Sequence, residues 1–348
     1  MDIENKTIIL VTGAAGFIGA PTVLKLLRQD YKVIGIDNLN NYYDIGLKEK
    51  RLDKINNSSK KEKLDWIFFQ ISIEDNNSLI QIFEKYNIDI VINLAAQAGV
   101  RYSIINPYSY LQSNVVGFLN ILENCRKHNI KHLIYASSSS VYGGNKILPF
   151  KEENSVDHPV SFYAATKRTN EIMAHSYSHL YGIAATGLRF FTVYGPWGRP
   201  DMAPIIFSKL IMEDKPIDVF NYGKMMRDFT YIDDVVEGIM RCCKKQATKD
   251  DNFDYSKPKP STSFAPHRIF NIGNNSPVKL IYFIELLEKN LGKKAHKLMQ
   301  PMQNGDVVET ASSTELLKNW VGYKSNTPIE DGIKKFTTWF LNYYGYKS

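Results

Sequence analysis

The stretch TGAAGFIG (residues 12–19) constrains the fold of this chain more than any other feature. It follows a short apolar segment at 7–13 and opens a helical pattern over 17–28. Between a buried strand and a helix, Gly13 allows a tight turn, Gly16 lets the backbone approach a pyrophosphate, and Gly19 lets the helix pack on the sheet. The free N–H groups at the helix N-terminus favour an anion there. The stretch therefore predicts a dinucleotide-binding turn.

The next strand, KVIGID (32–37), ends in Asp37, 18 residues after Gly19. A carboxylate at this position can accept hydrogen bonds from both hydroxyls of an adenosine ribose, and it repels a 2′-phosphate. The sequence therefore predicts NAD rather than NADP. The alternative is a glycine turn beside an unrelated surface aspartate, and the strand–turn–helix context argues against it.

Strand-like and helix-like segments alternate through the first half of the chain. Further strands are expected at 64–71, 88–96 and 132–136, with a helix at 76–87. Such alternation predicts an α/β fold: a Rossmann-type, doubly wound parallel sheet with helices on both faces. A length of 348 residues suits a second lobe. We expect an NAD-binding domain at 1–188, to which segments near 229–246 and 268–274 return. The rest of 189–348 is expected to form mainly a smaller α/β substrate-binding lobe, with a surface loop at 246–267.

Composition excludes several other classes of protein. Cys125, Cys242 and Cys243 form neither a disulfide framework nor a metal-ligand spacing, so we expect a cytoplasmic protein without a metal site. Glycines, Pro21 and Lys25 interrupt the first apolar stretch, which argues against export or a membrane span. The net charge is +7, with lysines concentrated at 47–63, but no stacking aromatics accompany them. We therefore expect a solvated loop and helix face there, and no nucleic-acid partner.

The segment SFYAATKRTNEIMAHSY (161–177) is predicted to be helical, which places Tyr163 and Lys167 one turn apart on the same face. A neighbouring ammonium group favours the phenolate form of tyrosine. Lowering the pKa of a tyrosine from ~10 to ~7 takes about 4 kcal/mol, so Lys167 and a nicotinamide charge would have to share the task. Without the glycine turn, an ordinary amphipathic helix would be the better interpretation.

Four serines stand in ASSSSVYG (136–143), at the end of an apolar strand and before turn residues. A serine linker belongs between domains and not at the tip of a strand, and four residues are too few for a low-complexity tract. The serines are therefore expected to serve a site.

The glycine spacing together with the Tyr-x-x-x-Lys pattern resembles the extended short-chain dehydrogenase/reductase family. In that family a serine or threonine lies 25 positions before the tyrosine, which is Ser138 here. The resemblance implies that Ser138 hydrogen-bonds the reacting sugar hydroxyl and relays its proton to Tyr163. The chain departs from the family pattern at two positions. Pro21 is expected to kink the first helix, and Ser72 replaces an aspartate that usually meets the adenine amino group.

Ser139 and Ser140 also exclude related reactions. Nucleotide-sugar dehydratases of the family carry Asp-Glu at these positions, and the related decarboxylases carry a glutamate before the valine. A hydroxyl is a poor acid or base near neutral pH, so dehydration and decarboxylation are disfavoured. The resemblance implies that Ser139 and Ser140 line a sugar pocket.

The segments at 95–103, 161–171, 189–202 and 223–238 resemble UDP-glucuronate 4-epimerases, and the resemblance covers almost the whole chain. It is weakest at 301–313, where Asn304 and Ser313 replace an expected proline and aspartate. It implies that Arg227 contacts the diphosphate, that Phe220 stacks near uracil and that Asp306 holds the uridine ribose. Arg101 is also expected to contact the substrate. Thr192 and Arg199 are expected to hold a C6 carboxylate. The alternatives are a surface ion pair for Arg227 or Arg199 and a plain core position for Phe220.

We therefore expect an NAD-dependent C4 epimerase acting on UDP-glucuronate and UDP-galacturonate through a 4-keto intermediate, with Ser138, Tyr163 and Lys167 as catalytic residues. Other UDP-sugar 4-epimerases, a dehydrogenase that releases its cofactor, and an inactive NAD sensor are the alternatives. The resemblance also implies a homodimer formed through helices at 107–127 and 163–181. The residues expected to bind NAD are Gly13, Gly16, Phe17, Ile18, Gly19, Asp37, Asn38, Ile73, Leu94, Ala95 and Ala96, together with Tyr163 and Lys167.

Overall fold

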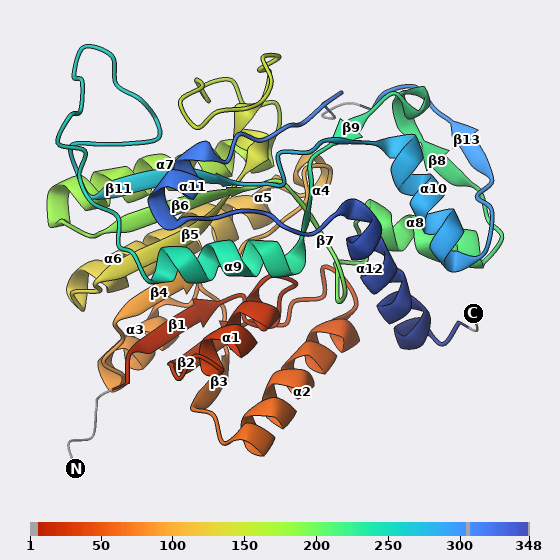
Figure 1. The fold of residues 1–348 in the computed structure, drawn as a ribbon. Helices are drawn as coiled ribbons and strands as arrows, with labels where there is room; N and C mark the ends of the chain where they lie inside the picture. The colour runs from red at the N-terminus through yellow and green to blue at the C-terminus, as the bar shows by residue number, and fades with distance from the viewer. Residues whose placement is uncertain (1–5, 304–306, 347–348) are drawn as a thin grey trace.

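A seven-stranded parallel sheet forms the centre of the larger lobe (Figure 1). The computed structural model describes residues 6–303 and 307–346. The strand order is β11-β6-β5-β4-β1-β2-β3, and every neighbouring pair is parallel. The order reverses between β1 and β4, which opens a crevice at the carboxyl ends of the strands. The strands are β1 (Ile8–Thr12), β2 (Lys32–Asp37), β3 (Trp66–Gln70), β4 (Ile90–Asn93), β5 (His132–Ser138), β6 (Ala185–Phe190) and β11 (His267–Ile272). The predicted doubly wound fold is confirmed.

Helices cover both faces of this sheet because alternate strand residues point to opposite sides. Ile9 and Val11 pack into the core that includes α1 and α9, whereas Leu10 packs into the core of α3 and α6. The flanking helices are α1 (Gly19–Leu27), α2 (Ile45–Glu62), α3 (Asn76–Lys85), α6 (Phe118–Lys127), α7 (Phe162–Tyr181) and α9 (Ile232–Cys243). The helix expected at 107–127 is divided into α5 (Pro107–Tyr110), a π-helical turn (Leu111–Gly117) and α6, with α4 (Tyr102–Ile105) before it.

The expected kink at Pro21 is wrong. Helix α1 begins at Gly19, two residues later than the pattern suggested, so Pro21 lies in the first turn. The backbone N–H groups of a first turn have no partner within the helix, so a missing N–H is tolerated there.

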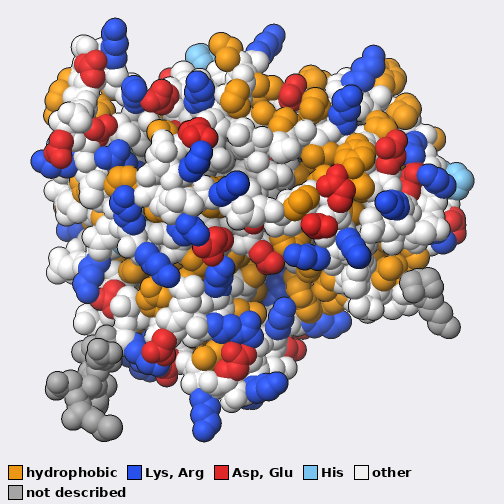
Figure 2. Space-filling view, viewed as in Figure 1, with side chains coloured by type: hydrophobic (Ala, Val, Ile, Leu, Met, Phe, Trp, Pro, Cys, Tyr) orange, Lys and Arg blue, Asp and Glu red, His pale blue; other side chains and the backbone are white. Residues whose placement is uncertain are grey.

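The expected solvated face at 47–63 is only partly correct. These residues form most of α2, and the lysines near its C-terminus are exposed, but Lys48 and Arg51 are buried with Leu47, Leu52 and Ile55. Elsewhere, Figure 2 shows basic and acidic side chains interspersed over the face that it presents.

The smaller lobe consists of short strands and helices that follow β6. The described residues of this lobe form three two-stranded sheets, in which β7 pairs with β10, β9 with β12 and β8 with β13. Its elements are β7 (Thr192–Tyr194), α8 (Ala203–Met212), β8 (Ile217–Val219), β9 (Met226–Arg227), β10 (Phe229–Tyr231), β12 (Val278–Lys279), α10 (Leu280–Leu291), β13 (Lys297–Met299) and α12 (Ile329–Tyr344).

Among the described residues, the chain returns to the larger lobe three times. Helix α9 packs against α1, β11 pairs with β6 at the edge of the central sheet, and α11 (Glu315–Val321) packs against β11 (Figure 1). Between α9 and β11 the chain runs through an irregular loop, in which Tyr255 is exposed. No helix in the described part of the chain is long and apolar enough to cross a membrane.

Candidate active site

A cavity of about 410 Å³ lies at the carboxyl ends of the central strands, where the strand order reverses. This is the usual ligand position in open α/β sheets, and the volume suits a small-molecule site. The structure brings together in its wall the three expected catalytic residues, all of the expected NAD-binding residues, and four expected substrate residues: Ser139, Ser140, Thr192 and Arg199.

The glycine turn has the shape that a pyrophosphate requires. Gly13 has φ +68°, and its carbonyl oxygen accepts a hydrogen bond from the Gly16 N–H at 2.9 Å. A Cβ on Gly13 would lie 2.8 Å from the Ala95 backbone nitrogen, and one on Gly19 only 2.0 Å from the Gly13 carbonyl oxygen. Only glycine fits these positions, so the backbone at the start of α1 stays open to an anion. This turn therefore fits NAD.

Asp37 is held at the cavity wall beside this turn. Its carboxylate accepts hydrogen bonds from the backbone N–H groups of Ala15 at 3.1 Å and Leu39 at 2.9 Å, and the residue is only 9% exposed. A carboxylate oxygen has two lone pairs, so both oxygens keep acceptor capacity for ribose hydroxyls. The ribose-binding role of Asp37 stays a prediction.

The part of the cavity next to Asn38 contains a carboxylate that the sequence interpretation missed. Asn38 donates a hydrogen bond to the Ser72 hydroxyl at 3.1 Å, and this hydroxyl donates to Glu74. Both Ser72 and Glu74 line the cavity. The sequence offered a signal for this carboxylate, because Glu74 follows two positions after Ser72, which replaces the usual aspartate of the family. Tyr42, Tyr43, Lys48, Gln97 and Gly99 also line the cavity and were not predicted.

The catalytic residues come from two neighbouring elements. Ser138 is the last residue of β5, and its hydroxyl accepts from the Ser140 N–H at 3.1 Å. Ser161 caps α7, which places Tyr163 in the first turn and Lys167 one turn later. The Lys167 ammonium group is buried and donates to the Ala136 carbonyl oxygen at 3.0 Å. Burial lowers the pKa of Lys167 to about 8.

The pKa of Tyr163 differs from the sequence-based expectation. Burial raises it, and this effect outweighs the lowering by the hydrogen bond with Ser138 and by the charge of Arg199. The groups of the protein alone therefore do not bring the phenol close to pH 7. The remaining shift needs a cation next to the ring, which is the effect expected of Lys167 together with a bound nicotinamide.

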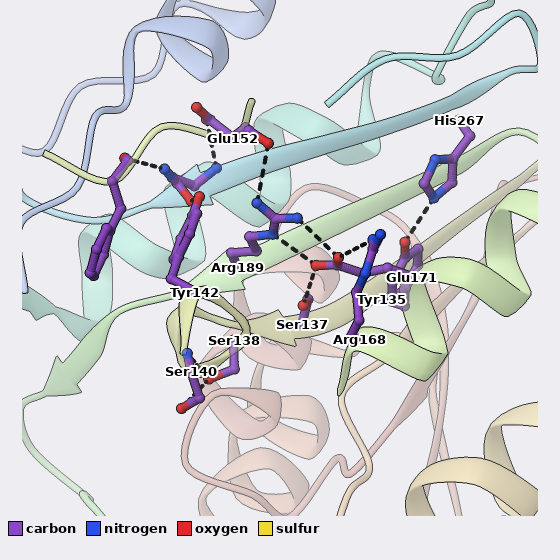
Figure 3. Close-up of polar contacts among 12 residues, drawn as sticks. Tyr135, Ser137, Ser138, Ser140, Tyr142, Glu152, Arg168, Glu171, Arg189 and His267 are labelled. Atoms are coloured by element: carbon purple, nitrogen blue, oxygen red, sulfur yellow. Dashed lines mark hydrogen bonds and ion pairs between the residues drawn. The ribbon is translucent and has the colours of Figure 1, made fainter. Parts of the chain in front are cut away.

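A buried polar network lies behind the serines (Figure 3). The Ser137 hydroxyl donates to Glu171 at 2.6 Å, and Arg189 donates to both oxygens of the same carboxylate at 2.8 and 3.0 Å. Arg168 adds a further contact with Glu171 at 3.2 Å. These bonds connect the end of β5, the middle of α7 and the end of β6. They fix β5, which carries Ser138, and α7, which carries Tyr163, relative to β6, which precedes Thr192 by two residues.

Arg199 lines the cavity and also has an internal partner. Its guanidinium donates to both oxygens of Asp201, at 3.1 and 2.5 Å, and the Tyr42 hydroxyl donates to the same carboxylate at 3.1 Å. The ion pair that was the alternative for Arg199 is therefore present. Burial opposes the charge of Arg199, but Asp201 outweighs it and raises the pKa of the guanidinium.

Three other expected substrate residues, Arg101, Phe220 and Arg227, do not line this cavity. The Arg101 guanidinium stacks over the Phe220 ring at 5.2 Å. Arg227 donates to the carbonyl oxygens of Met226 at 2.9 Å and Val308 at 3.1 Å. Asp306 and Asn304 lie outside the described residues. Among the residues that are described, no group of three or more His, Cys, Asp or Glu side chains is placed to hold a metal ion.

Comparison with known proteins identifies the family. Residues 9–273 match the model of the NAD dependent epimerase/dehydratase family. Protein CapI of Staphylococcus aureus is 52% identical over 97% of this chain and 99% of its own length. UDP-glucuronate 4-epimerase 4 of Arabidopsis thaliana is 45% identical over 98% of this chain and 77% of its own length. The crystal structure of UDP-glucuronic acid 4-epimerase from Bacillus cereus, in complex with UDP-glucuronic acid and NAD, superimposes with a TM-score of 0.84 at 31% identity, covering 97% of this chain and all of that one. This chain therefore belongs to the NAD-dependent epimerase/dehydratase family.

Proposed function

We infer that this chain is an NAD-dependent UDP-glucuronate 4-epimerase, which interconverts UDP-glucuronate and UDP-galacturonate. The observation that carries the inference is the composition of the cavity around Ser138. Tyr163 and Lys167 share this cavity with Ser138, and the residues that follow Ser138 carry hydroxyls where dehydratases and decarboxylases of the family carry carboxyl groups. Redox chemistry at C4 is therefore supported, and elimination is not.

Bound NAD supplies a hydride acceptor in the first half of the reaction and a hydride donor in the second. Ser138 holds the 4-hydroxyl group of the sugar and relays its proton to the Tyr163 phenolate, while the Lys167 ammonium group stabilises that phenolate. After the 4-keto sugar has turned its other face, Tyr163 returns the proton to the 4-oxygen through Ser138. The reaction begins and ends with the same cofactor state and the same protonation of Tyr163.

The sugar carboxylate needs a clamp, for which we propose Arg199 with Thr192. Oxidation at C4 produces a β-keto acid, which loses CO₂ when its C5–C6 bond lies parallel to the carbonyl π orbitals. A guanidinium fork can hold the carboxylate out of that alignment. Ser139 and Ser140 supply further hydroxyls in the same wall. We propose that Arg101, Phe220, Arg227 and Asp306 bind the UDP group.

The test is conversion of UDP-glucuronate by purified protein without added cofactor. We expect heating to release about one NAD per chain, and we expect either UDP-uronate to reach the same equilibrium mixture. A requirement for added NAD, with NADH formed in proportion to the sugar consumed, would instead identify a dehydrogenase. Faster turnover of UDP-glucose or UDP-N-acetylglucosamine would identify another UDP-sugar 4-epimerase.

We propose that two copies of the chain associate through α6 and α7. These helices pack side by side, and the surface around them exposes large apolar side chains: Tyr108, Leu111, Leu119, Ile172, Leu180 and Tyr181. A large exposed apolar surface commonly marks an interface. Light scattering should give a dimer for the wild type and a monomer for Leu180→Asp. Leu298→Asp, on β13, is the matched control, because Leu298 is also exposed but belongs to the smaller lobe.

We further propose that the protein works in the cytoplasm, because its three cysteines are buried and free.

The domain division at residue 188, with α9 and β11 returning to the first domain, remains a proposal as well. Limited proteolysis tests it, since cleavage between α9 and β11 should leave the two fragments associated.

A further inference from the structure

Arg51 lies on the buried face of α2 and is only 2% exposed. Its hydrogen-bond partners among the described residues are neutral oxygen atoms. The guanidinium donates to the carbonyl oxygens of Ala15 at 3.0 Å, Trp197 at 2.6 Å and Gly198 at 3.3 Å, and to the Tyr43 hydroxyl at 2.8 Å. Burying a cation without a carboxylate partner is costly, so this arrangement calls for an explanation.

These partners belong to three different segments of the cavity wall. Ala15 lies in the glycine turn, Tyr43 lies in the loop after Asp37, and Trp197 and Gly198 lie in the turn after β7. Only a rigid, planar group with several donors can reach all three at once. A lysine at this position would keep the charge but would lose the fork.

The turn that Arg51 holds has an unfavourable backbone conformation. Trp197 has φ +64°, which is a disfavoured conformation for a bulky residue, and Gly195 has φ +143°. Such a conformation persists only where its surroundings enforce it. The Trp197 ring packs against Trp339 and Tyr343 on α12, and Arg51 binds its carbonyl oxygen with two donors. Arg199 is the next residue after Gly198, so the same contacts fix the backbone from which its side chain projects.

We propose that Arg51 is a positioning residue that keeps Arg199 at a fixed distance from the glycine turn. This inference rests on the proposed function, in which Arg199 holds the sugar carboxylate and the glycine turn holds the pyrophosphate of NAD. With both anchors tied to one guanidinium, C4 of a bound uronate stays at a constant separation from the cofactor site. Displacement by about 1 Å can cost about a hundredfold in rate.

The test is Arg51→Lys, assayed with UDP-glucuronate and UDP-glucose. We expect kcat/KM to fall at least tenfold for UDP-glucuronate and less than threefold for UDP-glucose. The variant should also lose activity during turnover, because each decarboxylation releases CO₂ and UDP-4-ketopentose and leaves the bound cofactor as NADH. Retained NAD should stay close to that of the wild type. The unfolding temperature should fall, because buried acceptors lose their donors, so the assays are run below the unfolding transition of the variant. The matched control is Arg28→Lys. Arg28 follows α1 and pairs at the surface with Glu62 of α2, the helix that carries Arg51, so this variant should leave the ratio of kcat/KM for the two substrates unchanged.

Comparison with Arg199→Ala separates this inference from the proposed function. If Arg51 acts through Arg199, adding Arg51→Lys to Arg199→Ala should reduce the uronate preference no further. Two outcomes would overturn the inference and leave the proposed function intact. In the first, the double variant loses more uronate preference than Arg199→Ala alone. In the second, Arg199→Ala lowers the uronate preference but Arg51→Lys does not change it. Equal losses on both sugars in Arg199→Ala alone would contradict the clamp itself, and the inference with it.

A second variant is available if Arg51→Lys does not fold. Tyr43→Phe removes one acceptor from Arg51 and leaves its charge and length unchanged. We expect it to lower the uronate preference about twofold to threefold with NAD retained, and an unchanged preference would overturn the inference.

Discussion

The carboxylate of Glu171 and the guanidinium of Arg189 form a two-pronged ion pair with both side chains fully buried behind the serines of β5. Arg189 also stacks over the Tyr142 ring at 4.9 Å. Burial would raise the pKa of Glu171, but Arg189, Ser137 and Arg168 more than compensate, so its pKa is lowered. The charge on Glu171 is therefore part of the folded structure.

Glu171→Gln should destabilise the protein by about 3–5 kcal/mol, because it leaves Arg189 buried without its counter-charge. Urea unfolding at pH 7.5 measures the effect. Glu62→Gln is the matched control, since Glu62 forms a similar two-pronged pair with Arg28 at the surface and should hardly change the midpoint. Similar midpoint shifts in both variants would contradict the importance of burial.

Glu152 should make stability depend on pH. Burial raises its pKa from 4.5 to about 7, so the folded protein binds this proton more tightly than the unfolded chain does. Its contribution is fully present below pH 4.5 and is lost as the pH rises to about 7, by about 3 kcal/mol in total.

The test of this prediction is urea unfolding of wild type and Glu152→Gln at pH 5, 6, 7 and 8. The stability of the variant relative to wild type should increase from pH 5 to 7 and then level off. The buried His132 and His267 are present in both proteins, so their titration cancels in the difference. A difference that does not change with pH would show that Glu152 stays ionised.

Tyr163→Phe should abolish turnover and leave the fold and the retained NAD largely intact, because it removes only the proton-accepting oxygen. The measurements are kcat with UDP-glucuronate, circular dichroism and NAD released by heating. Activity above about a tenth of wild type, a loss below about 1.4 kcal/mol, would rule out the phenolate role.

Asp37→Ala combined with Asn38→Arg should shift cofactor preference toward NADP, since it removes the carboxylate that repels a 2′-phosphate and adds a cation. The readout is the ratio of NADP to NAD bound after unfolding and refolding with equal amounts of both. Asn38→Ala alone is the control. An unchanged ratio in the double variant would place the selectivity elsewhere.

Arg199→Ala should lower kcat/KM for UDP-glucuronate at least tenfold, about 1.4 kcal/mol or more, and should lower it much less for UDP-glucose. The reason is loss of the guanidinium fork that we assign to the sugar carboxylate. Product analysis should also detect UDP-4-ketopentose, in an amount no greater than that of the bound NAD, because each decarboxylation releases CO₂ and leaves the cofactor as NADH. Asp201→Asn is informative beside it, because Asp201 occupies the same fork in the structure and would compete with the substrate carboxylate. It should lower KM for UDP-glucuronate only.

The sequence predicted the larger lobe well because each strand and helix there has its own local pattern. Gly13, Asp37 and Tyr163 could be placed because their roles depend on strand ends and on a helical turn. Pairings between distant segments carry no such signal. The pair of Glu171 with Arg189 links a helix and a strand, and the contacts of Arg51 with Trp197 join positions 146 apart in the chain. A basic residue in a lysine-rich helix indicates a solvated face, so the burial of Arg51 could not be read from composition.

The late return of β11 to the sheet has a consequence for biosynthesis. Strand β6 ends at Phe190, but its outer neighbour begins only at His267. At a synthesis rate of ~5–20 residues per second, the ribosome needs several seconds to make the intervening chain, and during that time the backbone donors and acceptors along one side of β6 have no partner strand. An open strand edge invites pairing with other chains. The nascent polypeptide therefore carries an additional open strand edge until residue 272 has emerged, and we expect a chaperone to protect it during that interval.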